Sequence, residues 1–340
     1  MKLGFLDLPL SERRVYFEQA AQQRGVLSVI LEKDFWVCWL LGVLFDSEFG
    51  KALVFKGGTS LSKVYHAIER FSEDIDLSVS PDTLGLPQVD PATLSRTQAD
   101  RWMKQAEAAC GDFVRQQMQP QLEATIAEAL GPRAEAWLEF VIDPQTNSPV
   151  LHFYYPCVEP EGIDYLRRSV KLELGSLTDQ QPTGRHPIRP WVAEELPNAF
   201  DDWQCEVVAL ELERTFWEKA TILHAEYHRP ADRPTPSRFS RHYADMASLA
   251  IHPMAATALS LQELRERVVM WKSRFFGSGW ARYDLARPGT FRLAPTSERT
   301  ADLEQDYYAM RDMYLSPPQE FDVVISQLTD LEVRINRGVG

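Results

Sequence analysis

The chain combines helix-like and strand-like patterns of apolar residues. Residues 11–25 (SERRVYFEQAAQQRG) place apolar side chains at helical spacing, with Ser11 as the expected N-cap, and residues 27–46 predict a second, largely buried helix. Residues 53–58 (LVFKGG) have the composition of a strand that enters a tight turn. Apolar residues recur at helical spacing over 61–68, and IDLSV at 75–79 returns to strand character.

The middle of the chain predicts one long helix and three strands. Residues 93–130 form a long or broken helix, which Pro120 should interrupt. Residues 136–156 contain two strand-like runs around the turn DPQTNSP, which is a hairpin signal. In RRSVKLELGSL, residues 167–177, side chains of a strand alternate between apolar and charged.

The sequence from residue 176 onward indicates how the chain divides into domains. Residues 176–206 are rich in proline and are expected to be irregular, whereas the segments that follow, from VVALELERTFWEKATILHAEYH onward, are mainly helical. We therefore expect an N-terminal domain over 1–206 and a helical C-terminal subdomain over 207–340. A chain of 340 residues with 44% hydrophobic residues can bury a core of that size.

Composition excludes several classes of protein. The four cysteines have no CxxC spacing, so neither a zinc site nor a disulfide framework is indicated, and a reducing cytoplasm fits. The N-terminus lacks a signal-like apolar run, and the longest apolar run, at 35–45, is too short to span a bilayer, so we expect a soluble cytoplasmic protein without a membrane partner. The net charge of −13 gives no general attraction to nucleic acid.

The stretch LVFKGGTSLSK contains a candidate phosphate-binding turn. Glycines between a strand and a helix let backbone N–H groups approach an anion, so Gly57 and Gly58 are candidates, and Thr59 or Ser60 could cap the helix or hold a phosphate. A plain structural turn is the alternative. The P-loop pattern GxxxxGK[ST] does not fit, because Lys63 lies between Ser62 and Val64.

Two aspartates follow this turn. Asp74 and Asp76 share one face of a strand because side chains alternate with period two, and a hard cation such as Mg²⁺ would relieve their repulsion. Two metal ions need a further carboxylate, for which Glu173 is the best candidate because it lies opposite the apolar face of its strand. A solvated turn at Asp74 and a surface ion pair at Glu173 are the simpler alternatives.

Two further charged residues lie in the helical part. Thr215 and Lys219 are one helical turn apart, so Lys219 could meet a triphosphate as a point charge. Asp245 has the default interpretation of a structural partner of Arg241 or His242.

The order of these motifs resembles the AbiEii family of nucleotidyltransferase toxins, which is related to the MenT enzymes and to the DNA polymerase β superfamily. The motifs are KGGTSLSK, RFSEDIDL, SVKLELG, RTFWEKATILH and RHYADMASL, with EKDFWV and a C-terminal pattern as flanking matches. The resemblance implies an α+β fold, with a polymerase β-like mixed sheet, flanking helices and a mainly helical C-terminal subdomain that completes the active site. It also implies transfer of a nucleotide from an NTP to an acceptor, with two Mg²⁺ ions.

The resemblance also assigns residues and partners. Gly58 and Thr59 match the family's Gly-Ser/Thr step, Asp74 and Asp76 its metal-binding pair, and Lys219 and Asp245 its later Lys and Asp motifs, which implies a catalytic set of Asp74, Asp76, Lys219 and Asp245. Together with the reasoning from the residues themselves, we expect metal ligands Asp74, Asp76 and Glu173, and nucleotide contacts from Lys56, Gly57, Gly58, Thr59, Ser60, Ser72 and Lys219. The implied acceptor is RNA, above all the 3′ end of tRNA, and a cognate antitoxin is expected. The usual Arg-Asp-x-x-Asp reads Arg241-His242-Tyr243-Ala244-Asp245 here, which leaves the role of His242 open.

An RNA partner of so acidic a chain needs a local basic surface. Between Arg265 and Arg299, eight basic residues face three acidic ones, and aromatic residues are interleaved with them. The candidate RNA contacts are Trp271, Arg274, Trp280 and Arg282. The alternative is that these aromatic residues belong to the core.

Two other functions remain open at this point. The same nucleotide site could modify a protein hydroxyl instead of RNA. The chain could also be a non-catalytic nucleotide-binding subunit, although the presence of both Asp74 and Asp76 argues against that function.

Overall fold

The computed structural model describes residues 4–158, 168–200 and 203–338, which divide into two compact units. The first unit comprises the chain up to Val64 together with Phe71–Gln88 and Lys104–Ala209. The second comprises Tyr65–Arg70, Val89–Met103 and the chain from Leu210 onward. The domain division at residues 206 and 207 stays a prediction.

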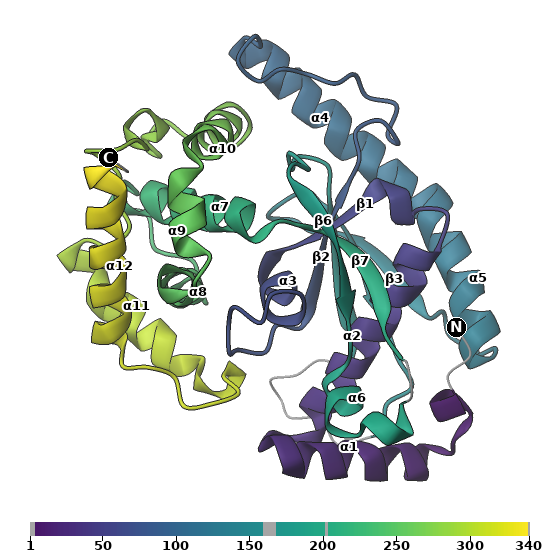
Figure 1. The fold of residues 1–340 in the computed structure, drawn as a ribbon. Coiled ribbons are helices and arrows are strands. Elements are labelled where there is room, and N and C mark those ends of the chain that lie inside the picture. Colours follow the sequence, from purple (N-terminus) through teal and green to yellow (C-terminus); the bar gives the residue numbers. More distant parts are fainter. Residues whose placement is uncertain (1–3, 159–167, 201–202, 339–340) are drawn as a thin grey trace. The chain divides into compact units, whose positions relative to one another are not determined.

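A mixed sheet of seven strands forms the centre of the first unit (Figure 1). Its order is β3-β4-β5-β2-β1-β7-β6. Strand β2 runs antiparallel to β1 and parallel to β5, β7 is parallel to β1, and β4 is antiparallel to both β3 and β5. The strands are β1 Leu53–Lys56, β2 Asp74–Val79, β3 Leu138–Ile142, β4 Pro149–Phe153, β5 Val170–Gly175, β6 Thr183–Ile188 and β7 Cys205–Leu210. The predicted mixed sheet with flanking helices is confirmed.

One face of the sheet is apolar because the central strands alternate strictly. On β2, Ile75, Leu77 and Val79 are buried, and β5 repeats the pattern with three buried apolar side chains. Helix α2, Ser28–Asp46, covers this face, where Trp39 stacks on Phe153 of β4. On β2 and β5 the opposite face carries the polar side chains of the two strands.

The other helical elements of the first unit surround the sheet and α2 (Figure 1). They include a short π-helical stretch, Val114–Met118, which ends two residues before Pro120. Proline lacks the N–H needed to continue a regular helix. The predicted interruption by Pro120 therefore takes the form of a local widening. These elements are η1 Gly4–Asp7, α1 Leu10–Arg24, η2 Gly50–Ala52, α3 Gly57–Lys63, η3 Val114–Met118, α5 Gln119–Leu130, α6 Trp191–Glu195 and η4 Pro197–Ala199. Helix α4, Arg96–Phe113, belongs to the second unit up to Met103 and to the first unit from Lys104.

Several element boundaries differ from the prediction. Helix α1 begins at Leu10 after Pro9, so Ser11 lies inside it and is not the N-cap. Helix α3 ends at Lys63, and the apolar residues up to Ile68 continue without a helix. Strands β6 and β7 replace the expected irregular and helical segments; Cys205–Leu210 becomes a strand because it pairs with β1 and buries alternate side chains.

The second unit is helical after Leu210, as predicted. Helix α8 contacts α7, α11 and α12, and α10 packs against α7. The helical elements are α7 Leu212–Tyr227, α8 Ser240–Ile251, α9 Ala255–Ser260, α10 Gln262–Phe275, η5 Tyr283–Leu285, α11 Ser297–Ala309, η6 Arg311–Met313 and α12 Phe321–Arg337. In the described part of the chain, no helix is both long enough and apolar enough to cross a membrane.

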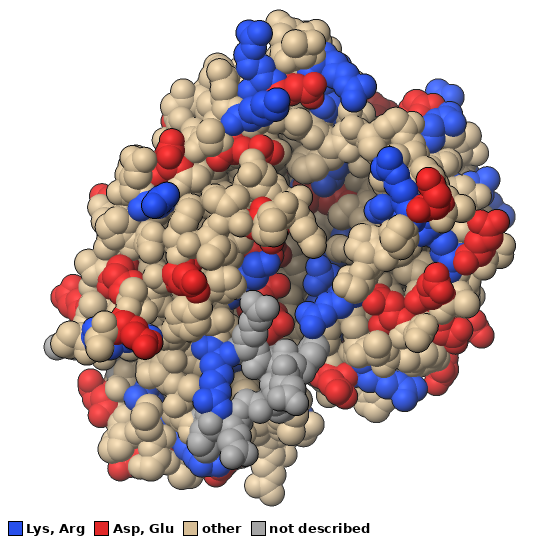
Figure 2. Space-filling model, turned by 180° about the vertical axis from the view of Figure 1, so that it is seen from behind, with Lys and Arg blue, Asp and Glu red and all other residues tan. Residues whose placement is uncertain are grey.

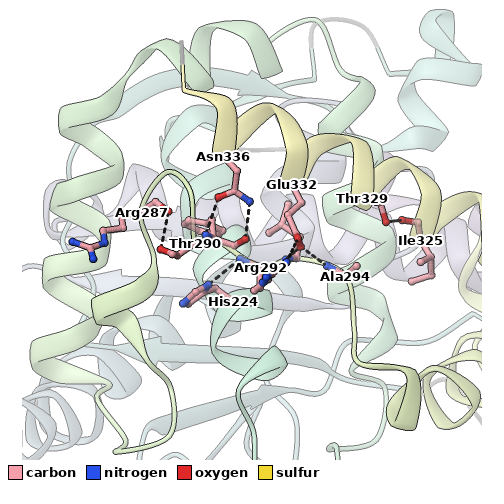
Figure 3. Close-up of polar contacts among 11 residues, drawn as sticks. His224, Arg287, Thr290, Arg292, Ala294, Ile325, Thr329, Glu332 and Asn336 are labelled. Atoms are coloured by element: carbon pink, nitrogen blue, oxygen red, sulfur yellow. Dashed lines mark hydrogen bonds and ion pairs between the residues drawn. The ribbon is translucent and has the colours of Figure 1, made fainter. Parts of the chain in front are cut away.

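Hydrogen bonds from side chains of α7 and α12 hold the non-helical segment that follows η5 (Figure 3). Glu332 accepts hydrogen bonds from the backbone N–H groups of Leu293 and Ala294, and Asn336 exchanges two hydrogen bonds with the backbone of Phe291. The ring of His224 on α7 accepts the N–H of Arg292 through Nδ1 at 3.1 Å. These contacts fix a segment that has no regular secondary structure of its own.

Candidate functional site

The polar face of the sheet carries the predicted aspartates. Asp74 and Asp76 of β2 are half-buried on the side opposite Ile75 and Leu77. The register places Lys56 of β1 and Glu173 of β5 on either side of Asp76, and Lys171 of β5 beside Asp74. Residues directly opposite in neighbouring strands point to the same face, so these charged side chains form one continuous surface.

Gly57 is required by the position of Asp76. Its φ angle is +80°, and a Cβ built on Gly57 would lie 2.0 Å from Oδ2 of Asp76. Any side chain here would therefore both strain the backbone and displace the carboxylate. The glycine found in the sequence motif thus lets β1 turn into α3 directly against Asp76.

The hydroxyls that follow the glycines are used inside the protein. Thr59 is buried, and its Oγ1 donates to the backbone carbonyls of Asp74 and Ser72, the latter at 3.2 Å. Ser60 is also buried and donates to the carbonyl of Gly57 at 3.0 Å. Thr59 therefore ties the start of β2 to the first turn of α3. Lys56, Gly57, Gly58 and Ser72 are partly exposed.

Charged residues in the apolar helix α2 anchor the same region, and the sequence analysis assigned them no role. Lys33 is buried and pairs with Glu73, the residue before Asp74. Asp34 pairs with Lys63 at the end of α3 at 2.8 Å, and its other oxygen accepts the backbone N–H of Trp191. The sequence does contain a sign of these roles. Lys33 and Asp34 are charged residues in the middle of an otherwise apolar helix, and a buried charge needs a partner of opposite charge.

The acidic cluster is electrostatically strained. Burial, together with the charges of Asp76, Glu73 and Glu173, raises the pKa of Asp74 to about 6, against a smaller opposing effect of Lys171. Several carboxylates thus share one small region with too little positive charge.

Carboxylate oxygens in this arrangement fit a hard divalent cation such as Mg²⁺. Asp74 and Asp76 would be its ligands. In the described residues, no three His, Cys, Asp or Glu side chains are already gathered as a ligand set, so the role of Glu173 as third ligand stays a prediction. In this structure Glu173 is paired with Lys171 on its own strand.

The second unit contains a buried cluster of three charges. Asp245 on α8 accepts hydrogen bonds from Arg70, at 2.7 and 2.8 Å, and from Nζ of Lys219 on α7, at 2.7 Å. The exposed fractions are 4% for Arg70, 7% for Lys219 and 1% for Asp245. Lys219 and Asp245 are therefore brought together as direct partners, whereas Arg70 was missed, although it opens the quoted motif RFSEDIDL.

This cluster holds more positive than negative charge. Burial alone would raise the pKa of Asp245, but Arg70 and Lys219 outweigh it and hold that pKa well below its ordinary value. Burial lowers the pKa of Lys219, as does the charge of Arg70, against the opposing effect of Asp245. His242 is neutral, because burial and the nearby cations hold its pKa well below the ordinary value. Asp245 thus takes Arg70 and Lys219 as partners, in place of the default partners Arg241 and His242.

The candidate RNA segment is only partly available. Arg274 donates to the carbonyl of Pro91, and Arg282 is exposed but makes a two-point contact with Asp284. Trp271 packs on Phe275, and Arg229 lies over the ring of Trp280. On the face shown in Figure 2, basic and acidic side chains are interspersed. The RNA contacts stay a prediction.

Comparison with known proteins identifies the family. The family model for nucleotidyl transferase AbiEii toxins of type IV toxin–antitoxin systems matches residues 39–327, so the chain belongs to that family. Among solved structures, the nucleotidyltransferase toxin MenT4 of Mycobacterium tuberculosis shares the fold, with 15% sequence identity and a TM-score of 0.50. The match covers 95% of this chain and 89% of MenT4. No curated protein sequence matches the chain.

Proposed function

We propose that this member of the AbiEii toxin family is a Mg²⁺-dependent enzyme that transfers a nucleotide from an NTP to an RNA acceptor, namely the 3′ end of a tRNA. The observation that carries the proposal is the pair Asp74 and Asp76 on the polar face of the sheet, with Gly57 directly against Asp76. A cognate antitoxin would oppose the activity, in keeping with the type IV systems to which the family belongs.

In the proposed reaction, the 3′-hydroxyl oxygen of the acceptor forms a bond to the α-phosphorus of the NTP. The α–β phosphoanhydride bond breaks, pyrophosphate leaves, and the proton of the hydroxyl is released to water. Bound divalent cations would favour the alkoxide form of the attacking oxygen and neutralise the departing phosphates. Asp74 and Asp76 would hold those cations, and Thr59 and Lys33 keep the strand that carries them in place.

Two parts of the chain are assigned to the triphosphate. The backbone of Gly57 and Gly58 and the side chain of Lys56 are partly exposed next to Asp76 and can face phosphate oxygens. Lys219 is assigned the role of offsetting phosphate charge. Its support is the buried cluster in which Lys219 and Arg70 share the single carboxylate of Asp245, because an anion would balance the remaining positive charge.

Incubation with each labelled NTP separately, in the presence of total RNA and total protein, tests the proposal. We expect label in small RNA, dependence on Mg²⁺, and loss of labelling in Asp76→Asn, which removes a metal ligand without opening a cavity. Label in the protein fraction would instead indicate a protein hydroxyl as acceptor. Absence of label from both fractions with every NTP would contradict an enzymatic function.

A further inference from the structure

Lys171 occupies an unusual place beside the proposed metal ligands. It is the neighbour of Asp74 in the register of β5 with β2, and its Nζ forms an ion pair with Glu173 two residues further along the same face. Lys171 opposes the acidic neighbours that raise the pKa of Asp74. Its own pKa is raised, because Glu173, Asp74 and Asp143 together outweigh the effect of burial, so Lys171 is charged.

A second carboxylate lies within reach of the same amine. Oδ2 of Asp143, at the end of the β3–β4 hairpin, is 3.9 Å from Nζ of Lys171. The other oxygen of Asp143 accepts backbone N–H groups from Gln145 and Thr146, which lower the pKa of Asp143. Asp143 is therefore an ionised acceptor, held by its own turn, within reach of the amine of Lys171.

These contacts suggest competition between an amine and a metal ion. A divalent cation that used Glu173 as a ligand would face the ammonium group already paired with it. The side chains of Lys171 and Glu173 are 29% and 35% exposed, and an ion pair this exposed contributes little free energy, so a divalent cation can displace it.

Building on the proposed function, we propose that Lys171 is a latch that pairs with Glu173 when no metal is bound and moves to Asp143 when a divalent cation takes Glu173 as a ligand. Lys171 is thus a positioning residue: it balances the acidic cluster at rest and sets how tightly the cation binds. The displaced amine keeps an ionised partner, so its move leaves no unpaired charge.

The test measures Mn²⁺ affinity of the full chain without nucleotide, from the electron paramagnetic resonance signal of free Mn²⁺. Lys171→Met keeps the length of the side chain and removes the charge, and we expect Mn²⁺ to bind about fivefold more tightly. Lys171→Gln serves as a second neutral variant. Arg185→Met, which removes an exposed cation paired with Glu206 on the same sheet, is the matched control and should leave the affinity unchanged.

A substitution of Asp143 tests whether Lys171 moves when the cation binds or acts only as a nearby positive charge. Asp143→Asn should weaken Mn²⁺ binding about threefold in the parent chain and have no effect in the Lys171→Met background. Equal weakening in both backgrounds would overturn the movement to Asp143. Unchanged or weaker Mn²⁺ binding in both neutral variants of Lys171 would overturn the latch itself.

The latch and the proposed function fail in different ways. Mn²⁺ binding must be lost in Asp76→Asn, which places the ion at the proposed site; wild-type protein that binds no Mn²⁺ there overturns the latch. If Mn²⁺ binding follows the expected pattern but no RNA is labelled, the proposed transfer is wrong and the latch stands.

Discussion

Arg70 donates hydrogen bonds to both carboxylate oxygens of Asp245, a residue 175 positions further along the chain. Both side chains are buried, so almost no water reaches the contact. The contact joins the short segment before β2 to helix α8 within the second unit. Lys219 contacts one of the same oxygens, so Arg70 fixes the carboxylate that in turn orients Lys219.

Removing Arg70 should destabilise the protein strongly. In Arg70→Met, the buried carboxylate of Asp245 keeps only Lys219, and we expect the free energy of unfolding to fall by about 3 kcal/mol in urea denaturation. Arg185→Met breaks an exposed pair and should cost less than about 0.5 kcal/mol. Similar losses in the two variants would contradict a structural role of Arg70 at Asp245.

Gly57→Ala should impair cation binding beyond its effect on the backbone. The new Cβ would lie 2.0 Å from Oδ2 of Asp76, and the positive φ angle adds strain. The matched control is Gly85→Ala, because Gly85 also has a positive φ angle but has open space around the site of a Cβ. We expect both variants to lose stability on thermal melting and only Gly57→Ala to lose Mn²⁺ affinity, by at least tenfold. Equal Mn²⁺ affinity in the two variants would show that Gly57 is only a turn residue.

Asp74→Asn should stabilise the metal-free protein. Above pH 7 the folded chain must keep Asp74 ionised although its surroundings raise the pKa to about 6. Removing that charge should increase the free energy of unfolding by about 2 kcal/mol, after allowance for partial exposure. Saturating Mg²⁺ should stabilise the wild type by a further 2–3 kcal/mol, roughly the effect of a hundredfold excess over Kd, and should not stabilise the variant.

Asp100→Asn, at an exposed position of α4, is the control for this charge change and should alter neither quantity. A metal-free Asp74→Asn protein that is less stable than the wild type would show that the carboxylate makes a structural contact that outweighs the repulsion.

Acid should destabilise the protein through His224, which holds the segment after η5 by accepting a hydrogen bond from Arg292. The Nδ1 atom of His224 accepts a hydrogen bond from the N–H of Arg292 (Figure 3). Its Nε2 faces the carbonyl of Arg282, and burial lowers the pKa of His224 to about 4. The unfolded chain takes up this proton near pH 6.5, so stability is complete above that pH. It should fall between pH 6.5 and 4 by about 3 kcal/mol on account of this residue.

Urea denaturation at a series of pH values measures the effect. His224→Gln should be less stable at pH 7, and its stability should lose the pH dependence that comes from the uptake of about one proton. His186→Gln, at a half-buried position of β6, should retain the wild-type dependence. An unchanged slope in His224→Gln would assign the acid sensitivity to other groups.

RNA binding through the basic segment should depend on salt. Filter binding of purified tRNA across a salt series should show a slope that decreases by up to about 1.4 in Arg274→Ala/Arg282→Ala, because each lost phosphate contact on a single strand contributes about 0.7. The pairing of Arg282 with Asp284 should reduce the observed change. Arg14→Ala/Arg185→Ala removes two exposed arginines elsewhere and is the control. Equal slopes in the two double variants would place the acceptor on another surface.

The sequence by itself determined which side chains share a face. Strict alternation in DIDLSV and VKLELG places Asp74, Asp76, Lys171 and Glu173 opposite the apolar core, and the Gly-Gly step after β1 predicts a tight turn. These features follow from the local geometry of the backbone, which has the same period wherever a strand occurs.

Only the tertiary structure decided which of these residues are neighbours. Alternation does not specify register, so the pairing of Asp76 with Glu173 and of Asp74 with Lys171 had to come from the packed sheet. Strand β7 depends likewise on a partner strand distant in sequence, and Lys63 at the end of α3 pairs with Asp34 of α2. The partners of Lys33 and Arg70 do too, because a buried charge is stable only where the fold brings an opposite charge to it.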